Sequence, residues 1–333
     1  MYNYFKIKKI NSQCRCLFLM TFLLSVAVGG VDAAQFRIQS RDVIIDQGGR
    51  TLRIERAYQR IISLYGAHTE NLFSLGLGEE IIGVSPHEVY PPPALQKPVF
   101  SYHDDPEKFL AAKPDLVLIR PMIDRGYPQL VGRLETSGIT VVSLQPGTID
   151  EMFSYWETLG ILTGRRQRAV ELADHFENAS QYLIKLTGDI EVKKRVYFEA
   201  IHSRMKTFSP DSMAIFTLQT AGGINVASDA QPVRKTNIAF YGKERILAHA
   251  AEIDVYLAQY GAMNTPTVAM IRKEPGYRAI KAIQDNEIYT IDEHIVSRPT
   301  LRLLDGIFEI GKILYPDRFG AEASKVVQNA KRL

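Results

Sequence analysis

Hydrophobic and polar positions alternate most regularly in the middle of the chain, between Arg165 and Leu186. Apolar residues recur there three and four positions apart, as on one face of a helix: Ala169, Leu172, Ala173, Phe176, Ala179, Leu183 and Leu186. Gly164 precedes the stretch and Gly188 follows it, and glycine commonly ends helices. The predicted helix is roughly 33 Å long. It fits either a connector between two domains or an amphipathic helix packed on one core.

Before this helix, short apolar runs alternate with helical patterns. Residues 35–58 predict a hairpin ribbon that turns at Gly48 and Gly49. A helix is predicted to start at Asp105, because Asp suits the cap and Pro106 the first helical position. Strands that alternate with helices indicate a parallel sheet covered on both faces. The strands are expected at 60–64, 81–84, 115–119 and 139–144, and the other helices at 69–75 and 127–137.

The same alternation restarts after the long helix, with strands expected at 195–200, 253–258 and 287–291 and helices at 212–221, 243–250, 267–274 and 300–314. The sequence therefore predicts an α/β fold of two lobes, each with a central, mostly parallel sheet, joined by a single long α-helix. We expect two separately packed lobes that face each other across a cleft. The predicted divisions are a ribbon at 34–58, lobes at 59–148 and 191–333, and a helical linker at 149–190.

The first 33 residues have the pattern of a secretory signal peptide. Lys6, Lys8 and Lys9 form a basic start, residues 17–28 are mostly apolar, and 31–33 are small or short residues suited to cleavage. A membrane anchor needs about 20 apolar residues, and this run is shorter. We expect the segment 1–33 to be cleaved and the remaining chain to be exported to the periplasm.

Composition agrees with a soluble globular protein, with 46% hydrophobic and 23% charged residues. The segment 1–33 contains four basic residues and one acid, so it accounts for the whole net charge of +3 and the remaining chain is neutral. Neutrality gives no electrostatic argument for binding nucleic acid. Cys14 and Cys16 leave with the signal and precede its apolar run. A soluble periplasmic protein is therefore favoured over a membrane-anchored lipoprotein.

Motifs of enzymatic chemistry do not occur in the sequence. Gly76 and Gly78 follow a predicted helix instead of opening one after a strand, so they do not form a dinucleotide-binding turn. The sequence also has no G-x-S-x-G elbow, no phosphate-binding loop and no H-E-x-x-H. We therefore expect no catalytic residue, no cofactor and no metal site.

Several segments, in their order along the chain, resemble the periplasmic substrate-binding proteins of ABC importers for iron siderophores, haem and cobalamin. The similar segments are 60–64, Thr69-Glu70, 75–78, 82–85, Glu107 with 113–118, 221–225, 297–299 and 303–305, and the likeness extends from about residue 60 to 319. The resemblance implies a monomer that delivers a metal chelate or corrinoid to an ABC permease and its ATPase. Glu107 and Glu244, each in the first turn of a predicted helix, match the family's paired docking glutamates, one on each lobe.

Arginine, tyrosine and histidine follow the predicted strands closely, where loops of the two lobes would meet. Arginine pairs with carboxylate or phosphate oxygens, and aromatic rings cover the apolar body of a large ligand. We expect ligand contacts from Tyr65, His68, Tyr102, His103, Arg120, His202, Arg204, Tyr260 and Arg298.

The ligand class is less clear from the sequence than the fold. Gly66-Ala67-His68 replaces the residues that the family often has before Thr-Glu, and Tyr102-His103 adds a second tyrosine and histidine. Tyrosine and histidine can bind haem iron or an exposed metal directly. We expect a ferric siderophore, with cobalamin or another corrinoid, haem and a molybdate-type oxyanion as alternatives. An enzyme on the same frame, such as a chelatase-like protein, is the alternative from another class.

Overall fold

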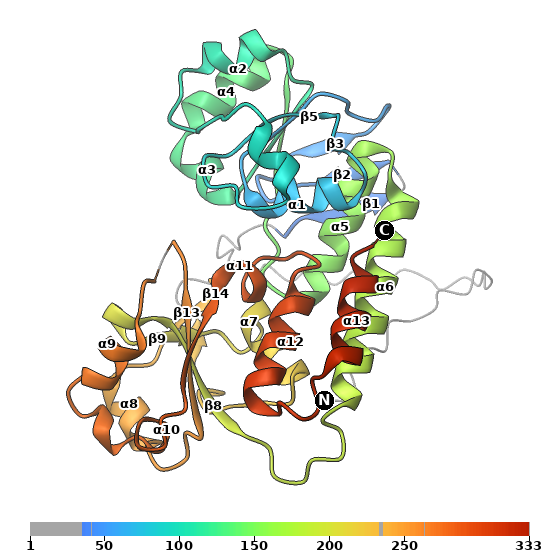
Figure 1. Cartoon of the computed structure of the whole chain (residues 1–333). Helices are drawn as coiled ribbons and strands as arrows, with labels where there is room; N and C mark the ends of the chain where they lie inside the picture. Colours follow the sequence, from blue (N-terminus) through green and yellow to red (C-terminus); the bar gives the residue numbers. More distant parts are fainter. Residues whose placement is uncertain (1–34, 41, 233–235, 263, 333) are drawn as a thin grey trace, which may run out of the picture.

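The computed structural model describes residues 35–332 except 41, 233–235 and 263. The predicted signal peptide, residues 1–33, lies outside these residues. Figure 1 shows two lobes, one above the other, with the helices α5 and α6 running along one side of the molecule. No helix among the described residues is both long enough and apolar enough to cross a membrane.

A three-stranded antiparallel ribbon precedes the first lobe. It consists of β1 (Arg37–Ser40), β2 (Val43–Ile45) and β3 (Thr51–Arg53). The predicted turn lies between β2 and β3, where Gly49 adopts a φ of +83°. Asp46 at this turn pairs with Arg50 at 2.9 Å and accepts a hydrogen bond from the Ser143 amide. Arg50 also pairs with Asp124, so the ribbon is fixed to the first lobe.

The first lobe contains a four-stranded parallel sheet in the order β5-β4-β6-β7. The predicted strands are confirmed, and the prediction for β5 matches residue for residue. The strands are β4 (Ile61–Ser63), β5 (Ile81–Val84), β6 (Leu116–Ile119) and β7 (Thr140–Ser143). The helices are α1 (Gly66–Ser74), α2 (Pro106–Ala112), α3 (Pro121–Gly126) and α4 (Pro128–Thr136), with a 3₁₀ turn at Pro92–Gln96. The Asp105 side chain caps α2 by accepting from the Glu107 amide, as predicted.

The second lobe is built on a mixed sheet in the order β11-β12-β9-β8-β13-β14. Its parallel strands are β8 (Arg195–Ile201), β13 (Val255–Tyr260) and β14 (Ile288–Asp292), with β10 (Ile224–Asn225) beside β8. β9 (Lys206–Phe208), β11 (Gln231–Pro232) and β12 (Ile238–Phe240) are antiparallel additions that the sequence pattern did not predict.

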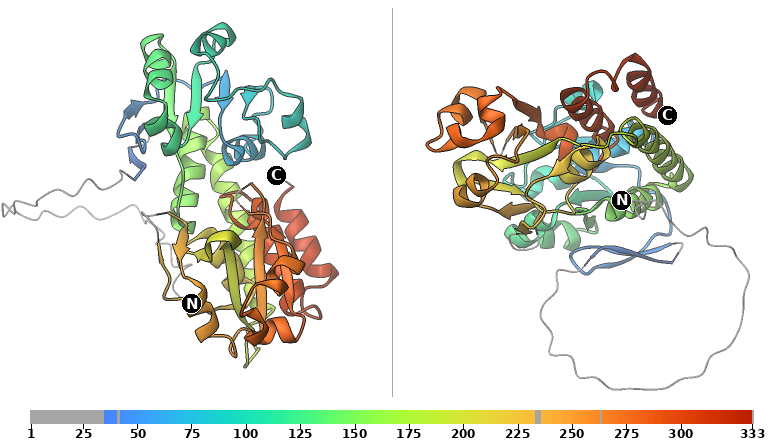
Figure 2. Two further views of the ribbon diagram at one scale, coloured as in Figure 1. Left: turned by 90° about the vertical axis from the view of Figure 1, so that its left-hand side faces the viewer. Right: turned by 90° about the horizontal axis from the view of Figure 1, so that it is seen from below.

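Helices cover both faces of this second sheet (Figure 2). The four helices expected from periodicity are present, although several are shorter than expected. The helices are α7 (Met213–Thr220), α8 (Lys243–Ala248), α9 (Val268–Lys273), α10 (Lys281–Gln284), α11 (Glu293–Val296), α12 (Leu303–Leu314) and α13 (Ala321–Ala330), with 3₁₀ turns at His202–Arg204 and Tyr277–Ala279.

The predicted long helix is α6 (Arg166–Lys185), and it packs against α5 (Ile149–Thr163) as an antiparallel pair. The turn between them uses Gly164 in the left-handed conformation, with φ +68°. Gly160 lets the two helices approach closely, because a Cβ there would lie 2.9 Å from the Cβ of Ala169. The linker is therefore a helical hairpin, of which α6 runs alongside both lobes.

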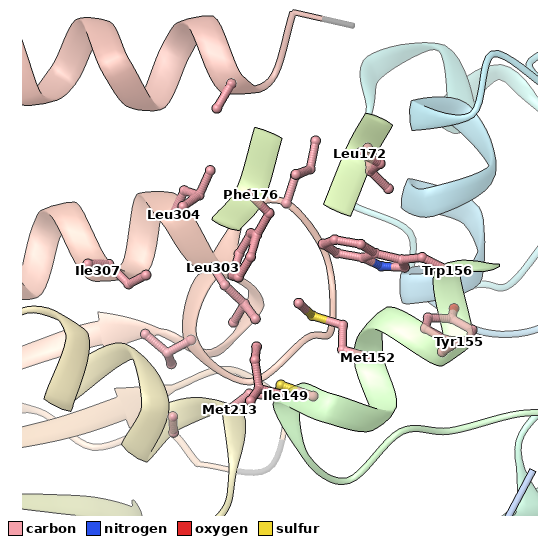
Figure 3. Packing of buried hydrophobic residues seen from close by; sticks show 14 of the residues in the cluster. Ile149, Met152, Tyr155, Trp156, Leu172, Phe176, Met213, Leu303, Leu304 and Ile307 are labelled. Carbon is pink, nitrogen blue, oxygen red and sulfur yellow. The ribbon is translucent and has the colours of Figure 1, made fainter. Parts of the chain in front are cut away.

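Aromatic side chains of this hairpin join the two lobes into one continuous core. Phe176 of α6 lies edge-on to Trp156 of α5, with ring centroids 5.6 Å apart (Figure 3). Phe176 also stacks with Phe216 of α7, with ring centroids 6.0 Å apart. The same buried cluster contains Leu118 of the first sheet and Leu257 of the second. The expectation of separately packed lobes is thus wrong for this layer, because apolar side chains of α5 and α6 belong to one buried cluster with residues of both lobes. Only the outer layers, which include Phe109 in the first lobe and Tyr277 in the second, form separate clusters.

Replacing Phe176 by alanine tests this shared core. We expect Phe176→Ala to lower the free energy of unfolding by about 3–5 kcal/mol, because the ring is fully buried. Val170→Ala on the exposed side of the same helix, where 42% of the residue is accessible, should change it by less than about 0.5 kcal/mol. Urea denaturation followed by circular dichroism measures both. Two separate unfolding transitions in the wild type would contradict a shared core.

Candidate functional site

The two lobes meet where a loop of the second lobe, residues 297–300, contacts helix α1 of the first. The carbonyl oxygen of Pro299 accepts two hydrogen bonds, from Asn71 Nδ2 at 2.9 Å and from Trp156 Nε1 at 3.2 Å. Both donors are buried side chains, so this loop is held firmly against α1 and α5. The loop carries Arg298, one of the predicted ligand contacts.

A carboxylate and two guanidinium groups form an ion pair across this junction. Glu70 of α1 is only 3% exposed. Its Oε1 pairs with Arg298 at 3.0 Å and with Arg302 at 3.4 Å. Burial raises the pKa of the Glu70 carboxyl, and the two arginines oppose that rise. The pair therefore connects the lobes in surroundings with little water, where electrostatic attraction is strong.

Tyr65 lies between the charged groups of the two lobes. It directly follows β4 and caps α1, and the guanidinium of Arg120 lies 4.6 Å from the centroid of its ring. Burial raises the pKa of the Tyr65 hydroxyl, and the nearby charges of Arg120 and Arg298 oppose it. Gly66 leaves room for Arg298, because a Cβ at this position would lie 2.2 Å from Nη1 of Arg298 and would displace the guanidinium. The structure thus brings the predicted contacts Tyr65, Arg120 and Arg298 together.

His68 has a structural role instead of the predicted ligand contact. Its ring is fully buried, with Nε2 3.1 Å from the Ile119 carbonyl and Nδ1 2.7 Å from the Tyr155 hydroxyl. Because a carbonyl can only accept, Nε2 carries the proton and Nδ1 accepts from Tyr155. Burial lowers the pKa of His68 to about 3. A neutral ring with both nitrogens occupied has no free position for a ligand.

Tyr102 and His103 form a second aromatic group with Tyr127, which the sequence pattern did not single out. The ring of Tyr102 lies 4.8 Å from that of Tyr127, and the Tyr127 hydroxyl is 3.2 Å from His103 Nδ1. His103 is exposed, and Tyr102 packs against the outer core of the first lobe. Within the described residues, no hydrogen bond or ring contact connects this group to Tyr65.

The predicted contacts of the second lobe are divided between its interior and its surface. His202 is 7% exposed, and its ring nitrogens face two carboxylates, Glu199 Oε2 at 2.9 Å and Glu274 Oε2 at 3.8 Å. The hydrogen bond with Glu199 raises the pKa of His202, and the ring is engaged within its own lobe instead of being free for a ligand. Tyr260, at the end of β13, and Arg204 are exposed and stay predictions.

Three further charged residues lie at the junction and were not predicted. Arg302 follows Arg298 by four residues, and its guanidinium also lies 4.8 Å from the centroid of the Tyr90 ring. Glu88 accepts hydrogen bonds from the hydroxyls of Ser85 and Thr69, and Glu293 accepts one from the Ala262 amide. Arg302 and Glu88 lie several residues beyond the nearest strand, whereas Glu293 directly follows β14 and had the position of a candidate, although an acid was not among the residue types expected to bind the ligand. Glu88 and Glu293 lie 18 and 223 positions after Glu70, and no pattern in the sequence indicates that these three acids belong to one junction.

The two candidate docking glutamates have the predicted placement. Glu107 lies in the first turn of α2 and Glu244 in the first turn of α8, and both are exposed. Glu107 pairs with Arg133 at 2.7 Å, a surface ion pair that water screens strongly. Each lobe therefore has an accessible carboxylate of this pair in the first turn of a helix.

Comparison with known proteins places these features in context. A family model described as periplasmic binding protein matches residues 61–295. An uncharacterised ABC transporter substrate-binding lipoprotein of Bacillus subtilis is 24% identical over 282 residues, 83% of this chain and 86% of the relative. A vitamin B12-binding protein of Vibrio cholerae is 24% identical over 255 residues, 76% of this chain and 87% of the relative. The solved structure of a possible iron-binding, periplasmic solute-binding protein from Staphylococcus epidermidis aligns with a TM-score of 0.68 and 28% identity, covering 78% of this chain and 100% of that one.

The buried neutral state of His68 makes stability depend on pH. Its pKa is about 3 in the fold, against 6.5 for an unburied histidine, so the unfolded chain binds the proton more readily between these values. Its contribution is present above pH 6.5 and is lost as pH falls toward 3. Between pH 7.5 and 4.5 it should amount to about 2–3 kcal/mol. His68→Gln should reduce this pH dependence by that amount in urea titrations, and His87→Gln, at an exposed histidine, should not. Equal pH dependence in all three proteins would contradict the assignment.

Proposed function

The chain belongs to the periplasmic binding protein family, as the substrate-binding component of an ABC importer, and on this premise we propose that it captures a ferric siderophore at the junction of its lobes. The observation that supports this most directly is the convergence of Tyr65 and Arg120 from one lobe with Arg298 from the other. Guanidinium groups donate to the oxygen atoms that surround a chelated ferric ion, and the tyrosine ring covers the apolar part of the chelator. The lobes 59–148 and 191–333 each supply one side of this site.

Two other ligand classes, corrinoids and haem, are alternatives to a ferric siderophore. The Vibrio cholerae relative is a vitamin B12-binding protein, which favours a corrinoid as the second candidate. Haem is the third, since the rings of Tyr102 and His103 lie 4.4 Å apart in the first lobe and both residue types bind haem iron. The function needs no catalytic residue, and we propose none.

Delivery requires docking on a permease, and we propose that Glu107 and Glu244 make the contact. Exposed carboxylates pair with arginines through charge-assisted hydrogen bonds, and one carboxylate on each lobe fixes the orientation of the complex. An export signal at 1–33, removed in the mature protein, would place the chain in the compartment where such a permease receives its ligand.

The ligand class is tested by purifying the protein from its native periplasm and recording an absorption spectrum together with a mass spectrum. We expect the broad visible band of a ferric chelate. A Soret band would identify haem instead, and corrinoid bands would identify cobalamin. Either would contradict the siderophore assignment and support the corresponding alternative.

The site is tested by fluorescence titration, because the chain contains a single tryptophan and Trp156 hydrogen-bonds to the loop that carries Arg298. A ferric siderophore should quench it on binding. We expect Arg298→Ala to weaken affinity roughly 10- to 100-fold, since a charge-assisted hydrogen bond contributes about 1.5–3 kcal/mol. Arg318→Ala is the control, because Arg318 forms an exposed ion pair with Asp189 and takes no part in the contacts of the junction. Unchanged affinity in Arg298→Ala would place the ligand elsewhere.

Docking is tested with Glu107→Ala and Glu244→Ala. Each variant should keep the ligand affinity of the wild type in solution and should fail to stimulate uptake or ATP hydrolysis by the permease complex in proteoliposomes. Glu322→Ala, at an exposed acid of α13, should behave as the wild type in both assays. A loss of ligand affinity in the first two variants would show that these glutamates serve the binding site.

A further inference from the structure

Three glutamates at the junction each have one carboxylate oxygen that is buried and unpartnered within the part of the chain that the structure describes. These are Oε2 of Glu70, Oε2 of Glu88 and Oε2 of Glu293. Glu70 and Glu88 belong to the first lobe and Glu293 to the second. Thr69, which donates to Glu88, adjoins Glu70 in α1, and Glu293 begins the helix α11 that leads into the loop 297–300. All three glutamates therefore lie near the contact between α1 and that loop.

Each carboxylate is held by its other oxygen. Glu70 Oε1 forms ion pairs with Arg298 and Arg302. Glu88 Oε1 accepts from the Ser85 hydroxyl at 2.6 Å and from the Thr69 hydroxyl at 3.2 Å, and Glu293 Oε1 accepts from the Ala262 amide at 2.9 Å. The fold thus orients all three side chains and leaves one acceptor of each unused.

An unused buried acceptor is unfavourable. A buried polar group without a partner costs about 1–3 kcal/mol, and more when it is charged. Glu70 shows this most clearly, because the residue is 3% exposed and its Oε2 has no partner although two arginines lie on Oε1. Three such atoms at the junction of the lobes point to a partner that arrives from outside the fold.

The chemistry of that partner follows from the atoms present. Carboxylate oxygens at neutral pH accept hydrogen bonds and attract cations. The described residues contain no group of three or more His, Cys, Asp or Glu placed to hold a metal ion, which disfavours a bare cation. N–H groups and an ammonium satisfy separate carboxylates, whereas the nearby Arg120 requires oxygen acceptors, and its Nε is itself buried without a partner.

We propose that Glu70, Glu88 and Glu293 recognise N–H donors of the ligand, so that the bound chelate carries amide N–H groups and an ammonium beside its iron-binding oxygens. This inference rests on the proposed function and names the chelator class as a hydroxamate with a free amine. Among the described residues, neither Glu88 nor Glu293 has a cation within ion-pair distance, so these two carboxylates meet the ammonium and Glu70 meets an amide. A catecholate or a haem would bring further negative charge beside Glu88 and Glu293, which no cation among the described residues pairs with, and this is unfavourable in a buried site.

The experiment uses a matched pair of ligands, a ferric trihydroxamate with a terminal primary amine and the same complex with that amine acetylated. Both are titrated against the full-length mature protein by quenching of Trp156, together with cobalamin, which has amide N–H groups and no ammonium. We expect the amine form to bind at least tenfold more tightly than the acetylated form. Glu88→Gln and Glu293→Gln should each reduce that preference to less than threefold, while Glu322→Gln should leave it unchanged.

Stability measurements separate recognition from a structural role. Because each variant removes a partly buried carboxylate charge that no cation among the described residues pairs with, Glu88→Gln and Glu293→Gln should unfold at the same or a higher urea concentration than the wild type. A structural role would instead lower that midpoint and weaken both ligands equally. That result, or equal affinity of the wild type for the amine and acetylated forms, would overturn the inference while leaving the siderophore function in place.

The cobalamin titration separates the inference from the proposed function. If only cobalamin binds and Glu70→Gln weakens it at least tenfold, the siderophore assignment fails and the recognition of N–H donors stands. If only cobalamin binds and none of the three Glu→Gln variants weakens it, both fail. Binding of none of the three probes also overturns both.

Discussion

The continuous apolar packing around Phe176 is the constraint on which the rest of the molecule depends. Phe176 contacts Trp156 on the neighbouring helix and Phe216 in the second lobe, so α6 cannot shift without disturbing side chains of both lobes. Close-packed interiors resist such displacement, because even small voids remove favourable contacts. The two sheets are therefore held at a defined separation by the helical hairpin, and the loops at the junction meet in one arrangement.

Within that arrangement, the junction is polar although its surroundings are apolar. The charge of Glu70 is compensated by Arg298 and Arg302 from the opposite lobe. Tyr65 lies among these three groups. Buried charges are tolerated only when they are paired or hydrogen-bonded, so the unused oxygens of Glu70, Glu88 and Glu293 and the unused Nε of Arg120 stand out at this junction. A family that carries ligands between two lobes is expected to keep such capacity at this place, because a fully satisfied junction would have nothing to offer a ligand.

The sequence predicted the elements of this fold better than its contacts. Buried strands such as β5 have a compact run of apolar residues between turn signals, and Asp105-Pro106 marks the start of α2, so both could be located from local patterns. The two- and three-residue strands β9 to β12 are too short to show a period. Partners far apart in the chain were not predictable: His68 meets Tyr155 87 positions away and Glu70 meets Arg298 228 positions away. Placement after a strand led to Tyr65, Arg120 and Arg298, which the fold brings together, but it could not distinguish His68, whose ring turns into the core.

The double hydrogen bond to the Pro299 carbonyl has a consequence for how fast and how tightly the protein can work. It immobilises the backbone next to Arg298 before any ligand arrives, since Asn71 and Trp156 are themselves buried. Ordering a loop during association reduces affinity, whereas a loop that is already ordered loses little further entropy. Encounter then requires no folding step on the protein side, and the lifetime of the complex is set by how readily the ligand's own groups leave a rigid surface.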